Sequence, residues 1–472
     1  MKEEAICYLS ACELAARIRR RELSAVEVMH AHLTQIERLN PTVNALVTIT
    51  AEQALRDARD ADQALRRSQT VGPLHGLPIA YKDLTETRGI RTTFGSPIYR
   101  DHVPHADALI VTRMKQAGAI TVGKTNTPEF GAGSQTFNTI FGATLNPYDL
   151  GKTCGGSSGG AAVALACGMV PLADGSDLGA SLRNPASFCN VVGLRPSLGR
   201  VPSWPATLGW SSLAVSGPLG RTVADVALQL SVMAGFDERA PLAIAESGAA
   251  FSINLARDFS GTRLAWSLDF CGLPFEPEVT KLVAAQRGVF SNMGCRVEDA
   301  TPDLADADNI FKVFRALEFE AKLGGDFDRH RSQMKDTVVW NIEEGRKLTG
   351  SLVARAERQR MQLHQRLYAF MQQYEFLILP TMQVAPFDVT QLYVDEINGI
   401  KLPTYIDWMK SCYFISATGQ PAISLPCGFT ANGLPVGIQI VGRHHDDLGV
   451  LQLAFAFEQL TQVGHRRPNL TP

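Results

Sequence analysis

The chain has 472 residues, of which 45% are hydrophobic and 19% are charged, and its formal net charge is −2. This composition is typical of a globular protein with a large core, and the near-neutral balance gives no reason to expect nucleic acid or an acidic membrane surface as a partner. The start lacks a secretory pattern, no apolar run is long enough to span a bilayer, and the nine cysteines show no paired spacing. We therefore expect a cytoplasmic protein with reduced thiols.

The first elements are predicted to be helices. Ser10 and Ser24 each precede a glutamate by three residues, which is the capping-box pattern of a helix start. Apolar residues recur at helical spacing after Ser24, and Asn40-Pro41 is predicted to end that helix. Two short apolar runs, at 77–81 and 119–122, then predict buried strands. Between them, 112–118 is predicted to be a helix that ends at a glycine.

Strands and helices continue to alternate along the rest of the chain. Further strands are predicted at 191–194, 263–266, 376–379, 421–425 and 436–441. Further helices are predicted at 161–167, within 343–373, and at 446–460. This alternation favours an α/β sheet covered by helices on both faces.

The chain is predicted to form a single domain, 1–472. Within it, 60–215 is expected to be the catalytic core. Charged helical stretches dominate 205–375, and this part is expected to be a helical insertion that shapes the substrate site.

Two serine-bearing loops and one lysine form the most informative pattern. The first loop is Gly155-Gly-Ser157-Ser-Gly-Gly160, and its Ser157 lies twenty-four residues before Ser181 in the second loop. Lys82 stands at the end of an apolar run. A serine hydroxyl becomes a good nucleophile when a base takes its proton, and a lysine amine can be that base where burial lowers its pKa. The residues before Ser181 can present consecutive backbone N–H groups to one point, as binding of an oxyanion requires.

In order and spacing, these segments resemble the amidase signature family of serine hydrolases, which use a Ser–cisSer–Lys triad. The resemblance covers nearly the whole chain and rests on PIAYKD at 78–83, GKTN at 123–126, NPY at 146–148, GGSSGG at 155–160, DLGASLRNPA at 177–186 and GP at 217–218. It implies an α/β amidase-signature fold, whose central mixed and twisted β-sheet is covered by helices on both faces.

The resemblance assigns a catalytic role to each of the three residues. Ser181 would be the nucleophile, Ser157, following a cis peptide bond, would bridge to it, and Lys82 would be the base. The implied oxyanion hole consists of the backbone N–H groups of Leu178, Gly179, Ala180 and Ser181. The family commonly has glycine at position 180, so we expect the alanine methyl group to narrow the acyl site without abolishing activity.

The residues expected to support the site are Ser158, Asp177 and Arg183, and those expected to contact the substrate are Gly133, Ser134, Phe130 and Phe137. We expect no metal or cofactor, because no H-E-x-x-H, Cys-x-x-Cys or nucleotide-binding glycine motif occurs.

The function that follows is hydrolysis of the C–N bond of a small-molecule carboxylic amide, aryl or acyl amides included, through a Ser181 acyl-enzyme. Esters or carbamates are expected as further substrates, and the enzyme is expected to be a monomer or homodimer. The alternative is the amidase subunit of a glutamine-dependent tRNA amidotransferase. Against it, residues 126–133 differ from the methionine-rich segment of those subunits, and 320–350 shows no counterpart of their glutamine-site stretch. A third hypothesis is a degenerate member that only binds ligands, which retention of the triad disfavours.

Overall fold

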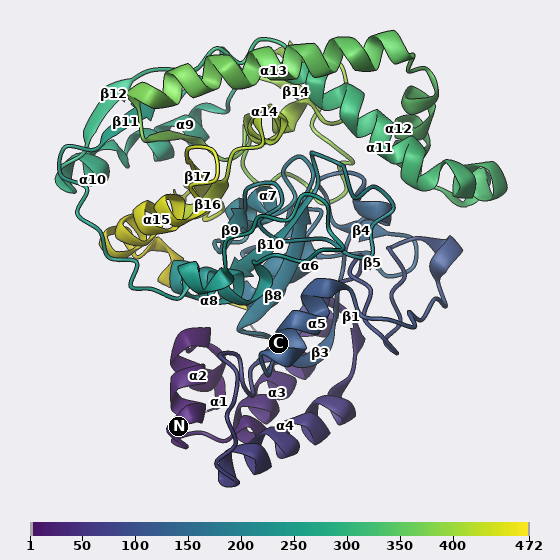
Figure 1. Cartoon of the computed structure of the whole chain (residues 1–472), viewed down its shortest axis with the longest axis vertical. Helices are drawn as coiled ribbons and strands as arrows, with labels where there is room; N and C mark the ends of the chain where they lie inside the picture. The colour runs from purple at the N-terminus through teal and green to yellow at the C-terminus, as the bar shows by residue number, and fades with distance from the viewer. Residues whose placement is uncertain (1–2, 471–472) are drawn as a thin grey trace.

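An eleven-stranded sheet forms the centre of the computed structural model, which describes residues 3–470 (Figure 1). In order across the sheet, the strands are β1 (Leu46–Ile49), β3 (Ile120–Thr125), β2 (Pro78–Lys82), β8 (Leu172–Asp177), β10 (Val215–Gly220), β9 (Val192–Arg195), β16 (Ala422–Phe429), β17 (Pro435–Val441), β13 (Phe376–Pro380), β11 (Arg263–Trp266) and β12 (Arg296–Asp299). Three two-stranded hairpins accompany it: β4 (Phe137–Asn138) with β5 (Gly142–Ala143), β6 (Leu145–Asn146) with β7 (Asp149–Thr153), and β14 (Glu396–Ile397) with β15 (Ile400–Lys401).

The sheet is mixed, and both of its faces are covered. Strand β2 runs parallel to both β3 and β8, whereas β10 is antiparallel to both β8 and β9. Every residue of β2, β13 and β17 is buried. Because successive side chains of a strand point to opposite faces, burial of all of them requires helices or loops on each side. The predicted α/β fold class is therefore confirmed.

The helices gather around this sheet and at the two ends of the molecule. They are α1 (Glu3–Cys7), α2 (Ala11–Arg19), α3 (Ala25–Val43), α4 (Ala51–Arg66), α5 (Leu109–Gln116), α6 (Gly159–Ala166), α7 (Arg183–Phe188), α8 (Val223–Met233), α9 (Pro277–Ala284), α10 (Arg287–Asn292), α11 (Ala307–His330), α12 (Asp336–Arg346), α13 (Gly350–Gln373), α14 (Lys410–Thr418) and α15 (Asp447–Thr461). In Figure 1, α1 to α4 lie at the bottom and α11 to α13 at the top.

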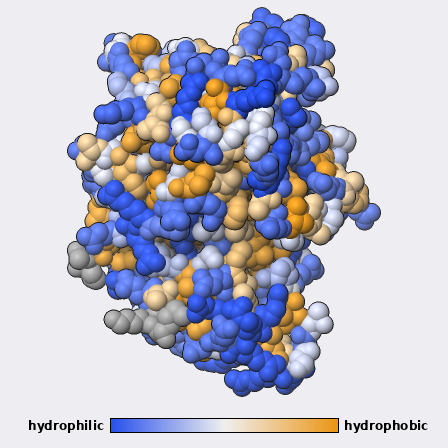
Figure 2. All heavy atoms as spheres, turned by 90° about the vertical axis from the view of Figure 1, so that its left-hand side faces the viewer, coloured by the Kyte–Doolittle hydropathy of each residue, from blue (hydrophilic) through white to orange (hydrophobic). Residues whose placement is uncertain are grey.

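The surface is mixed in polarity. Figure 2 shows apolar side chains on one face as patches broken up by polar ones. Among the helices of residues 3–470, none combines the length and the apolar character that a membrane span requires.

The helix starts at Ser10 and Ser24 are as predicted, but one helix end is not. Ser24 and Glu27 form a complete capping box, and the Ser10 hydroxyl accepts the Glu13 backbone N–H. The predicted end of α3 at Asn40-Pro41 is wrong, because the helix continues to Val43. A proline so near the end removes one backbone donor, and the Asn40 side chain binds two backbone N–H groups just beyond the helix, which holds the last turn in place.

The segment 205–375 is not entirely helical. It contains β10, β11 and β12, all of which belong to the central sheet, so the sheet extends well beyond residue 215. The expected helical stretch within 343–373 covers the end of α12 and all of α13, which begins after Thr349 as its N-cap. The long helix α11 precedes these two and reaches over the site described next.

Candidate active site

Lys82 ends β2 in the middle of the sheet, and its side chain is fully buried. Its Nζ lies 2.7 Å from Ser157 Oγ, 2.9 Å from Ser158 Oγ and 3.1 Å from Ser176 Oγ. Burial lowers the pKa of Lys82 to about 7, although nearby aspartates partly oppose this by favouring the ammonium. A large fraction of Lys82 is therefore a neutral amine near neutral pH.

The loop that carries Ser157 lies between β7 and α6 and depends on its glycines. A side chain on Gly159 would place its Cβ 2.3 Å from Thr136 Oγ1, and one on Gly160 would approach the Asn126 backbone nitrogen to 2.4 Å. Only glycine permits this close packing. The peptide bond between Gly156 and Ser157 is cis.

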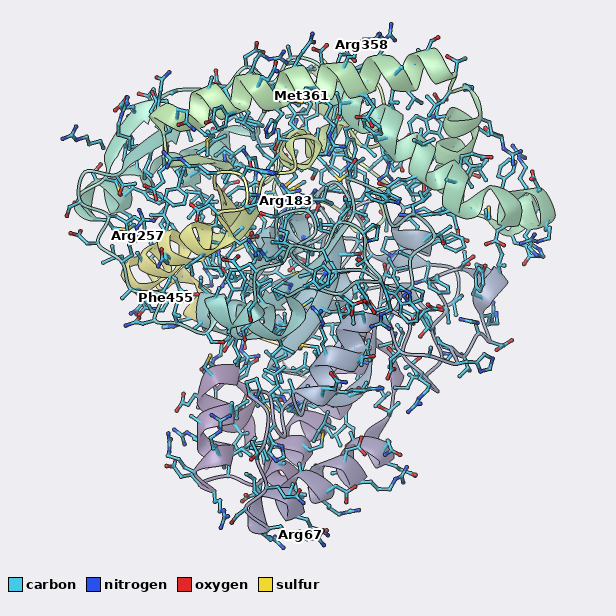
Figure 3. All side chains as sticks on the ribbon, in the orientation of Figure 1. Arg67, Arg183, Arg257, Arg358, Met361 and Phe455 are labelled. Carbon is cyan, nitrogen blue, oxygen red and sulfur yellow. The ribbon has the colours of Figure 1, made fainter. Side chains whose placement is uncertain are left out.

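The second serine loop follows β8 and is fixed by a buried ion-pair cluster. The carboxylate of Asp177 lies 3.1 Å from Arg183 Nε and 3.2 Å from Arg195 Nη1, and these side chains are at most 1% exposed. Figure 3 shows Arg183 in the middle of the molecule, whereas Arg67 and Arg358 lie at its edges. Burial opposes ionisation of Asp177, but the two arginines outweigh it and hold its pKa below the ordinary value.

This cluster holds the backbone of the loop from both ends. Asp177 accepts the N–H of Leu182, and Arg183 Nη2 donates to the Gly179 carbonyl at 2.7 Å. The backbone N–H groups of residues 178–181 make no hydrogen bond to any atom of residues 3–470. They remain available to an external acceptor. Ala180 has a negative φ and a buried methyl group, so alanine fits there without backbone strain.

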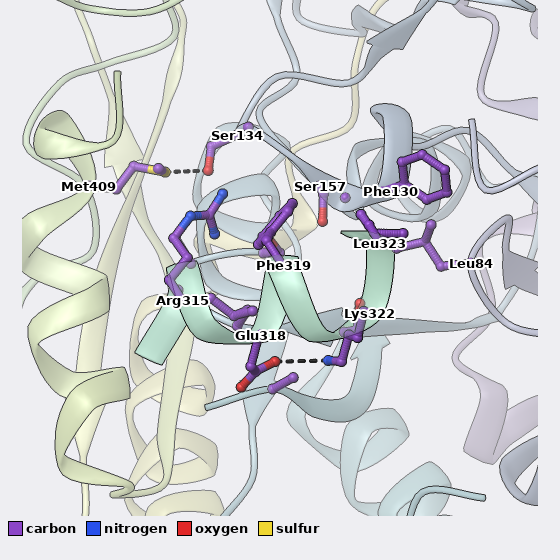
Figure 4. A pocket seen from close by; sticks show the side chains of 18 of the residues that line it. Leu84, Phe130, Ser134, Ser157, Arg315, Glu318, Phe319, Lys322, Leu323 and Met409 are labelled. Carbon is purple, nitrogen blue, oxygen red and sulfur yellow. Dashed lines mark hydrogen bonds and ion pairs between the residues drawn. The ribbon is translucent and has the colours of Figure 1, made fainter. Parts of the chain in front are cut away.

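A cavity of about 230 Å³ opens beside these loops, and both Ser157 and Ser181 line it. Its walls are largely apolar and aromatic, formed by Leu84, Phe94, Phe130, Leu178, Phe311, Phe319, Leu323 and Met409. Figure 4 shows that α11 supplies several of these side chains, together with Arg315, Glu318 and Lys322. The apolar walls suit hydrocarbon or aromatic groups next to an amide.

The residues expected to contact substrate divide into two groups. Phe130, Gly133 and Ser134 line the cavity, and the Ser134 hydroxyl contacts the sulfur of Met409. Phe137 is not among the residues that line this cavity, and the centre of its ring lies 4.0 Å from Lys335 Nζ, so its contact with substrate stays a prediction. Lys335 is the N-cap residue of α12.

Sequence patterns do not single out three further residues of the site. Asp174 binds the backbone N–H of Lys82 at 2.6 Å, and Ser176 contacts its Nζ. Polar residues two apart in an otherwise apolar strand are the available signal, because such residues share one face. Arg315 has no comparable signal, since it is one of many charged residues on α11.

Comparison with known proteins covers the whole site. The amidase family model matches residues 27–451. The chain is 36% identical to an acylamidase of Rhodococcus erythropolis, over 99% of this chain and 98% of that protein. It is also 36% identical to a subunit of the glutamyl-tRNA(Gln) amidotransferase of Moorella thermoacetica, over 98% and 99% of the two chains. A crystal structure of a bacterial aryl acylamidase of the amidase signature family superposes with a TM-score of 0.90 at 27% identity, covering 98% of this chain and 99% of that one.

Proposed function

Since this chain belongs to the amidase family and is a hydrolase of amide C–N bonds, we propose that it works through a Ser181 acyl-enzyme, with Ser157 and Lys82 as the proton relay. The observation that carries this proposal is the buried contact of 2.7 Å between Lys82 Nζ and Ser157 Oγ, in the wall of a cavity that Ser181 also lines. A depressed lysine pKa beside a serine is the condition for general-base catalysis without histidine.

The reaction proceeds in two stages. As Lys82 takes the proton of Ser157, Ser157 takes that of Ser181, and the Ser181 oxygen bonds to the amide carbonyl carbon. The negative charge passes to the carbonyl oxygen, which the backbone N–H groups of 178–181 stabilise. The proton returns through Ser157 to the nitrogen, the C–N bond breaks, and an amine or ammonia leaves. Water, deprotonated through the same relay, then hydrolyses the Ser181 ester and releases the carboxylic acid.

The substrate class follows from the cavity walls. Phenylalanine and leucine side chains surround the serines, so we propose aryl or acyl amides with apolar groups beside the scissile bond as substrates. Esters of similar shape would react by the same steps. We also propose a cytoplasmic enzyme, because all nine cysteines, which lie within residues 3–470, are free. A monomer or homodimer stays the expected oligomeric state.

A second candidate, suggested by the identity to the amidotransferase subunit, is release of ammonia from glutamine for a partner enzyme. Glutamine carries an ammonium and a carboxylate next to each other, and its ammonium would need a free acid in the cavity. The cavity acid, Glu318, already accepts from Lys322 at 2.8 Å and from Ser211. Glutamine is therefore the less favoured substrate.

The test combines a substrate panel with labelling of the nucleophile. Purified protein is assayed with 4-nitroacetanilide, aliphatic amides and glutamine, and then treated with a fluorophosphonate. We expect hydrolysis of the anilide, labelling of Ser181, and loss of labelling together with at least about a 10³-fold fall in kcat in Ser181→Ala. Ser176→Ala is the matched control, because Ser176 also contacts Lys82 but is not expected to carry the acyl group. Labelling of any other residue would refute the assignment of Ser181.

A further inference from the structure

Arg315 lies in the wall of the catalytic cavity without an acidic partner in residues 3–470, and we propose that it binds a carboxylate group carried by the amide substrate. This inference rests on the proposed function and narrows its substrate class: the amide would be apolar next to the scissile bond and would carry an acid at its far end.

The bonds of Arg315 leave part of its guanidinium free. The side chain is only 6% exposed, and its Nε donates to Asn341 Oδ1 at 2.9 Å and its Nη2 to the Tyr405 hydroxyl at 2.8 Å. Both acceptors are neutral. No Asp or Glu oxygen of the described residues lies within 4 Å of the guanidinium, and Nη1 has no acceptor among them. An anionic ligand in the cavity would supply the countercharge that this guanidinium lacks.

The other buried arginines of residues 3–470 show the usual arrangement. Arg183 and Arg195 both pair with Asp177, and Arg200 pairs with Asp447 at 2.9 Å. Each of these three guanidinium groups therefore contacts a carboxylate inside the protein, although Arg183 and Arg195 share the one of Asp177. Arg315 differs from them in two respects: it lacks an acid, and it lines a cavity.

The remaining charges of the cavity cancel each other. Glu318 and Lys322 also come from α11 and form an ion pair of 2.8 Å, drawn as a dashed line in Figure 4. Glu318 in addition accepts from the Ser211 hydroxyl, so each of its two oxygens already accepts a hydrogen bond. Among the charged residues of 3–470 that line the cavity, Arg315 is therefore the one without an ion pair.

The guanidinium is held in place for binding. Its Cζ lies 4.7 Å from the centre of the Phe319 ring and 5.9 Å from that of Tyr405. In Figure 4, Arg315 and Phe319 rise from α11 on the side of the pocket. Aromatic stacking and the two hydrogen bonds restrict the rotamers of this planar fork, and a restricted fork loses little entropy when it binds a carboxylate.

The position of Arg315 on α11 indicates that the ligand needs a spacer. Phe311, four residues earlier on the helix, packs against Gly179 of the oxyanion loop, since a Cβ on Gly179 would lie 2.8 Å from its ring. Four residues of helix rise about 6 Å. A carboxylate on Arg315 would therefore be separated from the scissile carbonyl by a spacer such as a phenylene ring or a short alkyl chain.

The experiment compares pairs of amides in which a carboxylate replaces a neutral group of similar size, and the comparison between protein variants cancels the difference in intrinsic reactivity within each pair. 4-Acetamidobenzoate and 4-nitroacetanilide place a carboxylate or a neutral nitro group of similar shape on the amine side. N-phenylsuccinamate and N-phenylbutanamide do the same on the acyl side. We measure kcat/KM for each in the wild type, in Arg315→Met and in Arg360→Met. Arg360 is the matched control, because it also binds neutral oxygens and stacks on a phenylalanine of α11 but does not line the cavity.

We expect the wild type to prefer the carboxylate of at least one pair. Arg315→Met should reduce that preference by about 10- to 100-fold, as loss of a charged hydrogen-bonded pair predicts, and Arg360→Met should leave it unchanged. The same ratio of carboxylate to neutral rates in the wild type and in Arg315→Met, for both pairs, would overturn the role of Arg315. Hydrolysis of the neutral amides through Ser181 without any preference would still leave the proposed function standing.

A binding measurement removes the dependence on turnover and on the folding of the arginine variant. Calorimetry with Ser181→Ala, which keeps Arg315, gives the Kd of the four compounds. Tighter binding of a carboxylate than of its neutral partner, by about tenfold or more, supports the proposal. Equal Kd values within both pairs overturn it, whatever the activity of the enzyme.

Discussion

Protonation of Lys82 should switch off amide hydrolysis as the pH falls through 7. Burial lowers the pKa of this lysine from 10.5 to about 7. At pH 7 about half of the molecules then hold a neutral amine, whereas an ordinary lysine would be neutral in about 3 of 10⁴ molecules. Since the base acts only when neutral, kcat/KM should be about 50-fold lower at pH 5 than at pH 7, and only about twofold higher at pH 9.

The assay is a pH–rate profile of kcat/KM with 4-nitroacetanilide, whose own charge does not change over this range. Lys82→Ala should remove the base, so that the residual rate rises with hydroxide concentration. Lys82→Arg should not restore activity, because a guanidinium stays protonated throughout. Circular dichroism shows whether each variant is folded.

Lys124 provides a matched control for this profile. It is equally buried, on the neighbouring strand β3, and burial lowers its pKa to about 8, but its Nζ donates to the Thr85 carbonyl and to Thr87. Lys124→Met should keep the step in the profile near pH 7. A folded Lys82→Arg variant with the wild-type rate at pH 7, or a wild-type profile that is flat between pH 5 and pH 9, would refute Lys82 as the base.

Three further predictions follow from buried contacts. Lys82→Met should raise the free energy of unfolding, relative to the wild type, by about 2–3 kcal/mol more at pH 6 than at pH 9. Between pH 7 and pH 10.5, the unfolded wild-type chain binds one proton more than the folded one, so the wild type gains stability as the pH rises. Equal differences in urea titrations at the two pH values would contradict this. Asp177→Asn should lower the free energy of unfolding by about 3–5 kcal/mol in the same titration, since two buried arginines lose their anion. Asp237→Asn, which removes a surface ion pair, should have far less effect. Similar losses in the two variants would show that the buried cluster stabilises the fold no more than a surface ion pair does. Gly179→Ala should lower kcat/KM about 10- to 100-fold by pushing the oxyanion loop away from Phe311. Adding Phe311→Leu should recover part of the loss. A double variant no more active than Gly179→Ala would mean that this contact does not position the loop.

The strands around the site could be predicted because their local sequence contains the necessary signal. Residues 78–82 and 435–441 are buried on both faces of the sheet, so they read as short continuous apolar runs. Helix ends depend on contacts beyond the helix. Pro41 indicates a stop, but the Asn40 side chain, bound to backbone beyond the helix, allows one more turn. Likewise β10, which contains Gly217-Pro218, lacks an apolar run, and its sequence alone does not predict a strand.

The candidate site is only partly accessible from sequence for the same reason. Loops that require glycine leave a visible pattern, and this pattern singles out Ser157 and Ser181. The surroundings of Lys82 instead come from residues about ninety positions away on β8, which no local pattern connects with it. The direction in which α11 presents Arg315 depends on packing between elements more than 100 residues apart, and only the fold reveals it.

The geometry around Lys82 also indicates which serine passes the proton. A neutral amine has two N–H bonds and one lone pair, so two of the three neighbouring hydroxyls accept from it and one donates to it. Ser158 Oγ lies 3.4 Å from the Ser176 carbonyl, its acceptor, and is therefore one of the two that accept from Lys82. Of the other two, Ser157 Oγ is closer to Nζ, at 2.7 Å against 3.1 Å for Ser176. We propose that, when Lys82 is neutral, the Ser157 hydroxyl donates its hydrogen bond to the lysine lone pair. In the proposed relay, Ser157 would then release this proton to Lys82 as it accepts the proton of Ser181, which would give the second serine its role between a buried lysine and a nucleophile in the cavity wall.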